Sequence, residues 1–467
     1  MSVATKPTLI QDWQNKRVTV MGLGGFGGGV GVTRWLAAAG AKIVVTDKAP
    51  AEKLRNSLDQ IADLHLPLHL DGHDARDFRD TDLVIVNPAV PETSEYLQLA
   101  RDASVPITTE INLFVERCPA RCVGITGSVG KSTVTAMIGK VLDEGTKARR
   151  HGGTKGRVWV GGNIGRSLLE GLGRITADDI VVLELSSFQL QRTPAVGWSP
   201  HVAVVTNITP NHLDWHGSFE AYVAAKLNLV RFQQPRDVVV IQDVPKLRRM
   251  LAPLVSDRPG IWRYGLDGDV PFAALDGDDR RLRWEKLKLP VPGRHNRENA
   301  AAALTVAQAL GVPAEIALSA LATFEALPHR LQRVAEREGV TYYNDSKSTT
   351  PEAAVTALRA IDAPLLVILG GYDKGSDLRP VAEEAARRAC FTACIGKTGP
   401  GLAQLVQAAG SDAAVFPDLR AAVRACRERA RPGDVVLLSP ACASWDQFID
   451  YRARGELFTR LAQGEDV

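Results

Sequence analysis

The sequence predicts an α/β protein of three domains, each built around a mostly parallel sheet. Three observations lead to this prediction. The chain has 467 residues, which is about three times the usual length of a domain. A strand followed by a glycine-rich turn and a helix occurs twice, near residues 17–47 and 122–142. Further strands that end in polar residues alternate with helical segments after residue 340.

The composition is that of a globular protein without a polyanionic partner. Hydrophobic residues make up 45% of the chain and charged residues 23%, while 56 basic and 53 acidic side chains leave a net charge of +3. A nucleic-acid-binding protein carries a larger basic excess. The chain has no apolar run of about 18 residues and no apolar signal core near its N-terminus. We expect a monomer in the cytoplasm that does not insert into membranes.

The cysteines predict buried, reduced thiols. Two pairs have C-x3-C spacing, but no histidine completes either pair at the spacing of a zinc site. The six cysteines are Cys118, Cys122, Cys390, Cys394, Cys426 and Cys442.

The first unit reads as a βαβ fold with a glycine fingerprint. A strand at 17–21 is followed by glycines at 22, 24 and 27, then by an apolar helix that reaches Ala39 and a second strand at 42–45. The pattern matches G-x-G-x-x-G, and Asp47 lies where a ribose-binding acid lies in dinucleotide folds. A third strand, 82–86, ends in Asn87. We expect Asp47 and Asn87 at the carboxyl edge of this sheet, where ligands of open α/β sheets bind.

The segment GITGSVGKST, residues 124–133, reads as a loop that cradles a nucleoside triphosphate. Glycines allow backbone N–H groups to approach phosphate oxygens, Lys131 supplies a cation, and the Ser132 hydroxyl can bind Mg²⁺. The usual pattern has glycine at the position of Ile125, so the loop is a variant. An ordinary strand-to-helix turn is the alternative, which the Gly-Lys-Ser sequence and the helical pattern that follows disfavour.

Two later strands bring polar residues to the same edge of the middle sheet. Glu184 ends the apolar strand 180–185, where it can hold Mg²⁺ directly or through water. His212 and Asp214 follow the strand 202–206, and a single loop histidine is about as often structural as ligating here. Helical spacing alone makes Lys226 a solvated lysine. Asn296 is expected to cap the alanine-rich helix at 300–310, leaving Asn299 to face a ligand.

The last unit gathers cations and hydroxyls at one rim. Strands at 341–343, 365–369 and 435–438 alternate with helices at about 351–360, 378–389 and 418–430. Weakly β-rich material at 236–292 looks like an insertion in the middle unit. The strand ends present Lys347, Thr349, Lys374 and Ser444, a set suited to a small molecule with carboxylates. Helix capping by Asp345 and Ser444 is the competing interpretation.

Taken together, these motifs resemble those of the ATP-dependent Mur ligases of peptidoglycan synthesis over nearly the whole chain, and in particular the glutamate-adding members. The resemblance rests on GITGSVGKST, ELSSFQL, NHLDWHGSFEAYVAAK, GRHNRENAAAA, PHR, NDSKSTTPEA, GGYDKGSD and LLSPACASWDQFIDYRARGELF. It implies a Rossmann-like UDP-sugar domain at 1–106, a central P-loop-type ATPase domain at 107–326 and a Rossmann-like glutamate domain at 327–467.

The resemblance also implies the reaction, an ATP-dependent joining of an acid to an amino acid. ATP phosphorylates the carboxylate of UDP-N-acetylmuramoyl-L-alanine, and glutamate attacks the acyl phosphate to form an amide. D-glutamate is the amino acid of these family members, although the residues themselves fit D- and L-glutamate equally. The small-molecule partners are ATP, the UDP-sugar and glutamate, and two Mg²⁺ ions are expected.

Site residues are carried over from the family by motif. The metal ligands and catalytic residues would be Lys131, Ser132, Glu184, His212 and Lys226, with Lys226 carboxylated by CO₂. ATP would contact Gly127, Ser128, Gly130, Lys131, Ser132, Thr133, Asn299, Arg330 and Asp345. The UDP-substrate would contact Gly25, Phe26, Asp47, Asn87 and Asn163, and glutamate would contact Lys347, Thr349, Lys374, Ser444 and Tyr451.

Several positions depart from the family pattern. Val129 and Asn211 replace a common asparagine and a common acid, Phe26 replaces a small polar residue, and Gln332 replaces a glutamate.

Three other functions are possible in principle for a chain with these motifs. A folate or other muramoyl ligase conflicts with SPACASWDQF, an NAD-dependent oxidoreductase leaves the phosphate loop without a role, and a non-enzymatic nucleotide-binding module conflicts with retention of Lys131 and Glu184.

Overall fold

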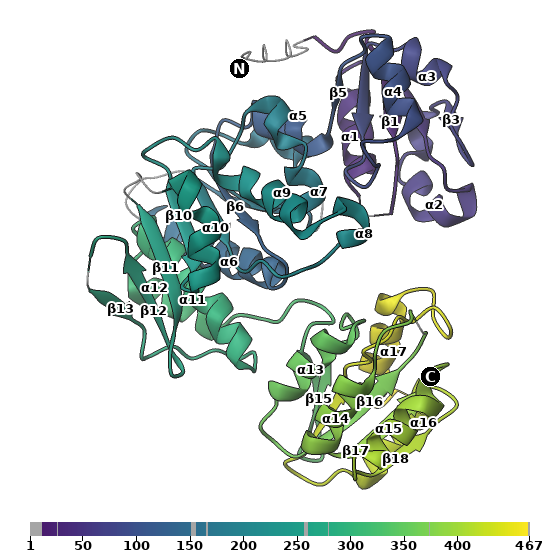
Figure 1. Ribbon diagram of the computed structural model, residues 1–467, viewed down its shortest axis with the longest axis vertical. Coiled ribbons are helices and arrows are strands. Elements are labelled where there is room, and N and C mark those ends of the chain that lie inside the picture. Colours follow the sequence, from purple (N-terminus) through teal and green to yellow (C-terminus); the bar gives the residue numbers. More distant parts are fainter. Residues whose placement is uncertain are drawn as a thin grey trace. The chain divides into compact units, whose positions relative to one another are not determined.

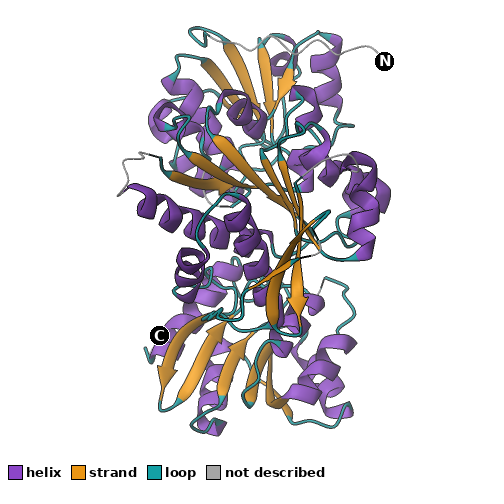
Figure 2. Cartoon of the chain, turned by 90° about the vertical axis from the view of Figure 1, so that its left-hand side faces the viewer, coloured by secondary structure: helices purple, strands orange, loops and turns teal. Residues whose placement is uncertain are grey.

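The computed structural model describes residues 12–25, 27–150, 156–164, 167–255, 260–278, 280–372 and 374–465. The chain forms two compact units, one of residues 1–287 and 298–321 and the other of residues 288–297 and 322–467. The first unit contains two sheets and the second contains one, and helices flank all three (Figures 1 and 2). The predicted three-domain α/β class is confirmed.

The N-terminal sheet is entirely parallel, because each strand returns through a helix or a crossover loop. Valines that alternate along its strands pack under α1 (Gly28–Ala38) on one face, and Met21 and Val86 pack with Phe78 and α4 (Glu95–Asp102) on the other. Across the sheet, the strands are β3 (Leu68–His69), β2 (Lys42–Thr46), β1 (Arg17–Met21), β4 (Leu83–Val86) and β5 (Ile107–Thr108). The remaining helices are α2 (Ala51–Asp59), α3 (Arg76–Arg79) and α5 (Glu110–Arg117).

The middle sheet has eight strands and is parallel except at one end. In order they are β13 (Arg281–Arg283), β12 (Val270–Leu275), β11 (Ile261–Asp267), β10 (Val238–Gln242), β9 (Val202–Val205), β6 (Arg121–Thr126), β8 (Ile180–Glu184) and β7 (Val158–Gly162). Pairing of β10 with β9 shows that residues 236–292 extend this sheet and include a helix, α10 (Pro245–Val255). The weakly β-rich material expected in the middle unit therefore forms part of the middle sheet itself, because β10 continues the parallel ladder.

The helices of this region position the site. They are α6 (Lys131–Arg150), α7 (Ser187–Leu190), α8 (Leu213–His216), α9 (Phe219–Arg231), α11 (Arg294–Ala309) and α12 (Ala314–Ala322). α6 and α9 pack on the sheet, whereas α8 packs on α9. Because α11 begins at Arg294, Asn296 lies inside the helix and donates to Pro292 O (2.7 Å). The predicted cap at Asn296 is therefore wrong.

The C-terminal sheet is parallel apart from its first pair of strands. Its order is β14 (Gln332–Arg337), β15 (Val340–Asn344), β19 (Val435–Leu438), β16 (Leu365–Gly370), β17 (Ala389–Ile395) and β18 (Ala413–Val415). Alternating residues of β16 and β19 face two cores, one shared with α13 (Pro351–Arg359), α14 (Arg379–Arg388) and α15 (Gly399–Ala408), the other with α16 (Leu419–Arg429) and α17 (Tyr451–Gln463).

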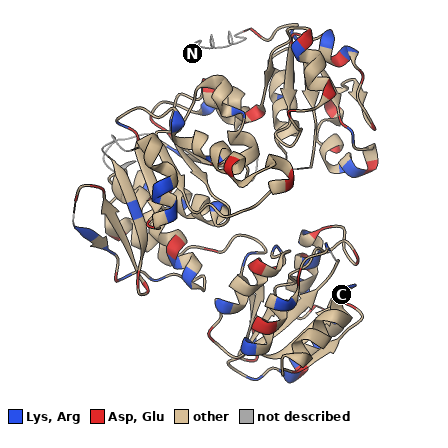
Figure 3. Ribbon diagram, viewed as in Figure 1, with Lys and Arg blue, Asp and Glu red and all other residues tan. Residues whose placement is uncertain are grey.

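Basic and acidic residues are interspersed along the chain in each unit (Figure 3). Among the described residues, no helix combines the length and apolar character needed to cross a bilayer.

All six cysteines are free thiols, but Cys390 is exposed and Cys118 is only partly buried. The prediction that every thiol is buried is wrong for these two, since Cys390 points outward from β17.

Candidate functional site

The phosphate loop joins β6 to α6, and its backbone requires glycine. Gly127 and Gly130 have φ values of +157° and +84°. A Cβ atom on Gly127 would lie 1.9 Å from Thr206 Oγ1, and one on Gly130 would lie 2.8 Å from Asn299 Oδ1. The loop therefore needs glycine at both places. It leads directly into the N-terminus of α6, where Lys131, Ser132 and Thr133 form the first turn.

A second loop clamps the phosphate loop from the adjacent strand. Asn207 follows β9, and its side-chain amide accepts from Val129 N (3.0 Å) and donates to Val129 O (3.0 Å). Thr206 Oγ1 donates to the same carbonyl (2.8 Å). These bonds occupy the peptide groups of Val129, whose side chain is 64% exposed. These three hydrogen bonds fix the backbone of the loop at Val129.

Ser128 anchors the loop to the interior. Its hydroxyl donates to Thr209 O (2.8 Å), accepts from Thr209 N (2.9 Å) and lies 2.9 Å from the Tyr222 hydroxyl. Burial raises the pKa of Tyr222, with the Ser128 hydrogen bond acting in the opposite direction. Tyr222 comes from α9, so this contact ties α9 to the loop.

Lys226 is buried directly beneath the phosphate loop. It is 2% exposed and donates from Nζ to Gly127 O (2.7 Å) and to Thr126 Oγ1 (3.4 Å). Its Nζ also lies 4.7 Å from the centre of the Tyr222 ring. Burial lowers the pKa of Lys226 to about 7, and repulsion by Lys131 adds to this effect while Glu184 opposes it. The prediction of a solvated lysine from helical spacing is wrong, because this face of α9 packs on the sheet.

Glu184 is also buried, at the end of β8 beside β6. Only 2% of the residue is exposed. Its Oε1 accepts from Asn163 Nδ2 (2.8 Å), whereas Oε2 has no hydrogen-bond partner among the described residues. A buried carboxylate oxygen without a partner is costly unless a cation or water satisfies it. Asn163 follows β7, so the structure places its side chain on Glu184.

His212 reaches the same edge from the loop after β9. It is exposed, has a φ of +53°, and its ring centre lies 5.0 Å from that of Phe188. Partial burial of the ring lowers the pKa of His212, and the charge of Lys131 lowers it further. Both effects favour the neutral imidazole, which is the form that binds metal ions. The neighbouring residue His216, which the sequence did not point to, has its Nε2 atom 3.0 Å from Ser187 Oγ.

The residues predicted to hold the UDP-substrate gather in the N-terminal sheet, with two exceptions. Asp47 Oδ2 accepts from Gly24 N (3.1 Å), and Asn87 Nδ2 donates to Gly22 O (3.2 Å). Gly25 lies exposed in the same glycine loop. Phe26 lies outside the described residues, and Asn163 lies beside Glu184 instead.

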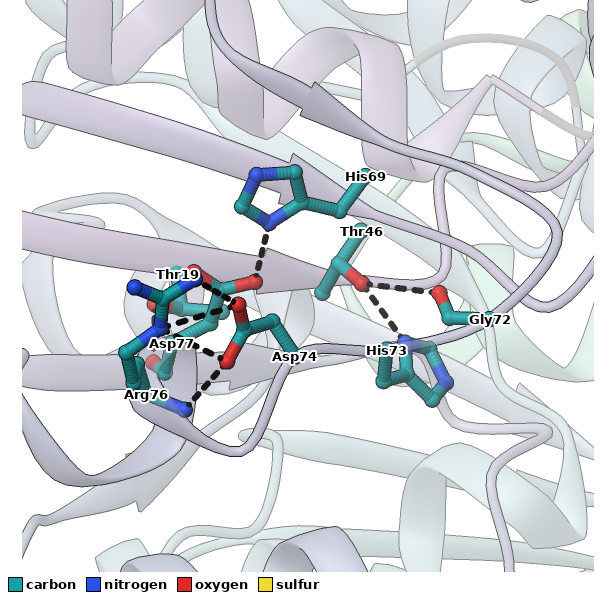
Figure 4. Close-up of polar contacts among 8 residues, drawn as sticks. All are labelled: Thr19, Thr46, His69, Gly72, His73, Asp74, Arg76 and Asp77. Atoms are coloured by element: carbon teal, nitrogen blue, oxygen red, sulfur yellow. Dashed lines mark hydrogen bonds and ion pairs between the residues drawn. The ribbon is translucent and has the colours of Figure 1, made fainter.

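A histidine that the sequence did not reveal supports the end of β2. Figure 4 shows Thr46 Oγ1 between Gly72 O (3.3 Å) and His73 Nδ1 (2.6 Å). In the same view, His69 Nδ1 lies 2.6 Å from Asp77 Oδ2. Burial lowers the pKa of His73, and Lys48 lowers it further. These contacts hold the end of β2, which Asp47 directly follows.

In the C-terminal unit, Asp345 is a buried carboxylate after β15. Its Oδ1 accepts from Leu331 N (3.1 Å) and its Oδ2 from Ser439 Oγ (2.8 Å). Burial raises the pKa of Asp345 to about 6, against the smaller opposing effects of hydrogen bonds and of Arg330. Helix α13 is preceded by Thr350, so Asp345 is not its cap. Capping as the role of Asp345 is therefore wrong.

The residues predicted to hold glutamate surround the carboxyl ends of β15, β16 and β19. Lys347 is exposed, and its Nζ lies 5.5 Å from the centre of the Tyr451 ring. Lys374 is also exposed, 4.9 Å from the centre of the Trp445 ring. Thr349 N donates to Lys347 O (2.9 Å), and Ser444 is buried. Two cations are thus held over aromatic rings at one rim.

Most of the predicted site residues lie at the sheet edges where the sequence placed them, but the residues that hold them in position were not predicted. These are Asn207, Tyr222 and His73. A detectable signal existed for Asn207, since it is the first polar residue after the strand 202–206. Tyr222 and His73 act through contacts between distant segments, which no local pattern contains.

Three family models match the chain in order. Residues 16–109 match the N-terminal domain described as Mur ligase MurD-like, residues 125–307 match the Mur ligase middle domain, and residues 329–442 match the Mur ligase, glutamate ligase domain.

Curated relatives match over nearly the full length. A UDP-N-acetylmuramoylalanine--D-glutamate ligase of Roseiflexus sp. (strain RS-1) is 39% identical, covering 96% of this chain and 98% of the relative. One of Pelotomaculum thermopropionicum is 36% identical, covering 97% and 98%.

Solved structures share the fold at lower identity. The UDP-N-acetylmuramate-alanine ligase MurC of Thermotoga maritima has a TM-score of 0.61 at 21% identity, covering 96% of this chain and 99% of that one. MurF ligase of the same organism, in complex with ADP, has a TM-score of 0.55 at 17% identity, covering 90% and 95%.

Proposed function

This chain belongs to the Mur ligase family, and from that premise we propose that it joins D-glutamate to UDP-N-acetylmuramoyl-L-alanine with conversion of ATP to ADP and phosphate, in the cytoplasmic synthesis of peptidoglycan precursors. The observation that carries the proposal is the pre-formed phosphate loop with Lys226 and the buried carboxylate of Glu184 at one sheet edge. We assign 1–106 to the UDP-sugar, 107–326 to ATP and 327–467 to glutamate, in a protein that acts as a monomer.

The chemistry begins with activation of a carboxylate. The carboxylate oxygen of the alanyl group attacks the γ-phosphorus of ATP, ADP leaves, and an acyl phosphate forms. The glutamate amine then attacks the acyl carbon, loses a proton and expels inorganic phosphate, which leaves an amide. A carboxylate is a poor electrophile until one oxygen becomes part of a leaving group, so the phosphate supplies the driving force.

The phosphate loop supplies the positive field for the transfer. The first turn of α6 directs N–H groups toward bound phosphates, and Lys131 adds a mobile cation. In the structure Lys131 Nζ donates to Ser128 O (3.1 Å), within the loop that it would serve. Asn299, which lies against Gly130, contacts the nucleotide, as do Arg330 and Asp345.

The residues fit a role for Mg²⁺. No group of three His, Cys, Asp or Glu side chains among the described residues forms a ready-made metal cage. Mg²⁺ instead binds through one or two protein ligands together with phosphate oxygens and water. Glu184, with its unpartnered Oε2, and Ser132 would hold one ion, and His212 a second. When bound, the ions neutralise phosphate charge.

Lys226 fits the proposed carboxylation. CO₂ reacts with a neutral amine, and burial already lowers the pKa of this lysine to about 7. Conversion to a carbamate replaces a buried cation with an anion, and removes the repulsion between Lys226 and Lys131. The carbamate would then support the second metal ion.

A direct assay tests the proposal. The protein is incubated with ATP, Mg²⁺ and UDP-N-acetylmuramoyl-L-alanine, with D-glutamate and L-glutamate in separate reactions. We expect ADP, phosphate and a product heavier by one glutamyl residue, with D-glutamate only. Lys131→Ala serves as the inactive control. Absence of glutamate-dependent phosphate release from the unmodified protein contradicts the proposal, and product formation with L-glutamate alone contradicts its stereochemistry.

A further inference from the structure

Arg454 is a fully buried arginine in the C-terminal unit. It lies in the first turn of α17, is 1% exposed, and has the largest of the fully buried side chains in the described part of the chain. No carboxylate oxygen of a described residue forms a salt bridge with it. Burial lowers the pKa of Arg454 only to about 10, so the guanidinium remains charged at neutral pH. Keeping such a charge inside a domain is costly unless its donors are well satisfied.

The guanidinium satisfies its donors on two loops at once. Its Nε and Nη2 donate to Ser346 Oγ (3.0 Å) and Ser346 O (2.9 Å). On the other side, Nη2 and Nη1 each lie 3.2 Å from Cys442 O, and Nη1 lies 3.3 Å from Ala443 O. Ser346 Oγ in turn donates to Tyr451 O (2.7 Å), which ties α17 to the first loop.

The third strand-end loop packs against the same group. A Cβ atom on Gly371 would lie 3.2 Å from Arg454 Nη1 and 2.2 Å from Ala443 O. Tyr372 N donates to Ala443 O (2.8 Å), so Ala443 O accepts from two of these elements. The loops after β15, β16 and β19 therefore meet at Arg454.

These are the loops that carry the predicted glutamate residues. Lys347 directly follows Ser346, Lys374 follows Tyr372 by two residues, and Ser444 follows Ala443. We propose that Arg454 is a positioning residue for the amino-acid site, holding the three loops in the register that glutamate binding needs. The identity of the substrate as glutamate rests on the proposed function. The positioning of the three loops by Arg454 rests on the hydrogen bonds alone.

The planar guanidinium is what the position requires. Its donors point in several fixed directions and reach both Ser346 and Cys442, whereas a lysine has donors on a single nitrogen. Asp345, by contrast, is held by Leu331 N and Ser439, which Arg454 does not contact. A change at Arg454 should therefore disturb glutamate more than the nucleotide.

The test compares Arg454→Lys and Arg454→Met with Arg460→Met in the full-length protein. Arg460 lies on the same helix but pairs with Glu465 at the surface, which makes it a matched control. We expect Arg454→Lys to raise the KM for glutamate by about tenfold and the KM values for ATP and the UDP-substrate by less than about twofold. Arg454→Met should raise the KM for glutamate further, and Arg460→Met should match the unmodified protein.

Amide hydrogen exchange supplies a readout that does not need activity. In Arg454→Lys, exchange should accelerate in segments 346–349, 371–374 and 441–448 and remain unchanged in the strands of this sheet. An unchanged KM for glutamate, or equal increases for all three substrates, overturns the positioning role. So does unchanged exchange in the three loops. If the unmodified protein has no ligase activity, the proposed function fails while exchange still decides the role of Arg454.

Discussion

Lys226 donates a 2.7 Å hydrogen bond from Nζ to the carbonyl oxygen of Gly127, the first glycine of the phosphate loop after β6. The lysine side chain is buried, so its charge is exerted on the loop and not on solvent. Any change in the protonation or covalent state of Lys226 is therefore transmitted to the place where phosphates bind.

The first prediction concerns pH. Burial lowers the pKa of Lys226 from 10.5 to about 7, so the neutral amine is scarce below neutral pH and predominates above it. Because CO₂ reacts with the neutral form, kcat should rise between about pH 6 and about pH 8 in buffers equilibrated with CO₂. Initial rates of phosphate release measure this. Removing CO₂ and bicarbonate should lower kcat, and Lys226→Arg should abolish the CO₂ effect. A rate indifferent to CO₂ contradicts carboxylation.

The second prediction concerns Glu184. Glu184→Gln keeps an acceptor for Asn163 Nδ2 but removes the negative charge from the buried Oε2. We expect the ligase rate to fall by about a hundredfold or more, since a charged metal ligand is lost. Titration of activity with Mg²⁺ should show a higher half-saturating concentration, while the thermal unfolding midpoint changes little. An unchanged Mg²⁺ requirement argues against Glu184 as a ligand.

The third prediction separates the effect of Asn207, which holds the phosphate loop, from that of the Val129 side chain. Asn207→Ala removes both hydrogen bonds to Val129 and should raise the KM for ATP by up to about thirtyfold, because each bond contributes about 1 kcal/mol to the loop conformation. Val129→Ala is the control, since the Val129 side chain is largely exposed and the substitution keeps the hydrogen bonds from its backbone to Asn207. The two variants should differ in KM for ATP. Equal values refute the clamp.

The fourth prediction concerns stability and pH. Burial raises the pKa of Asp345 from 3.8 to about 6, so the folded state binds the proton more tightly than the unfolded state. The resulting stabilisation is fully present below about pH 4 and is lost as the pH rises through about 6, a change on the order of 3 kcal/mol. Asp345→Asn cannot titrate and should lack this component.

Urea unfolding of the C-terminal unit at several pH values measures the effect. The free energy of unfolding of Asp345→Asn, relative to the unmodified protein, should increase from pH 4 to pH 7. Parallel pH profiles for the two proteins would show that Asp345 does not titrate in this range.

Local patterns sufficed for the strands that position the site. The predicted strands at 17–21 and 435–438 coincide with β1 and β19, because apolar runs bounded by polar residues are typical of buried parallel strands. The place of the β-rich region 236–292 in the middle sheet could not be predicted, because the pairing of β10 with β9 is a contact between distant segments. Periodicity carries no information on which strands become neighbours.

The chemistry of the site was only partly visible in the sequence. The glycines and Lys131 predict a phosphate loop because phosphate binding needs those residue types in a fixed order. The burial of Lys226 could not be read from α9, whose spacing fits a solvated face equally well. No local pattern distinguishes Arg454 from other arginines, and only the loops that converge on it reveal its position.

The central claim is that ATP activates the substrate carboxylate as an acyl phosphate. The most direct measurement labels that carboxylate of UDP-N-acetylmuramoyl-L-alanine with oxygen-18 and follows the label by mass spectrometry through one round of ligation. If the account is correct, the released phosphate carries one labelled oxygen for each amide formed. Released phosphate without label, alongside normal amide formation, would contradict it.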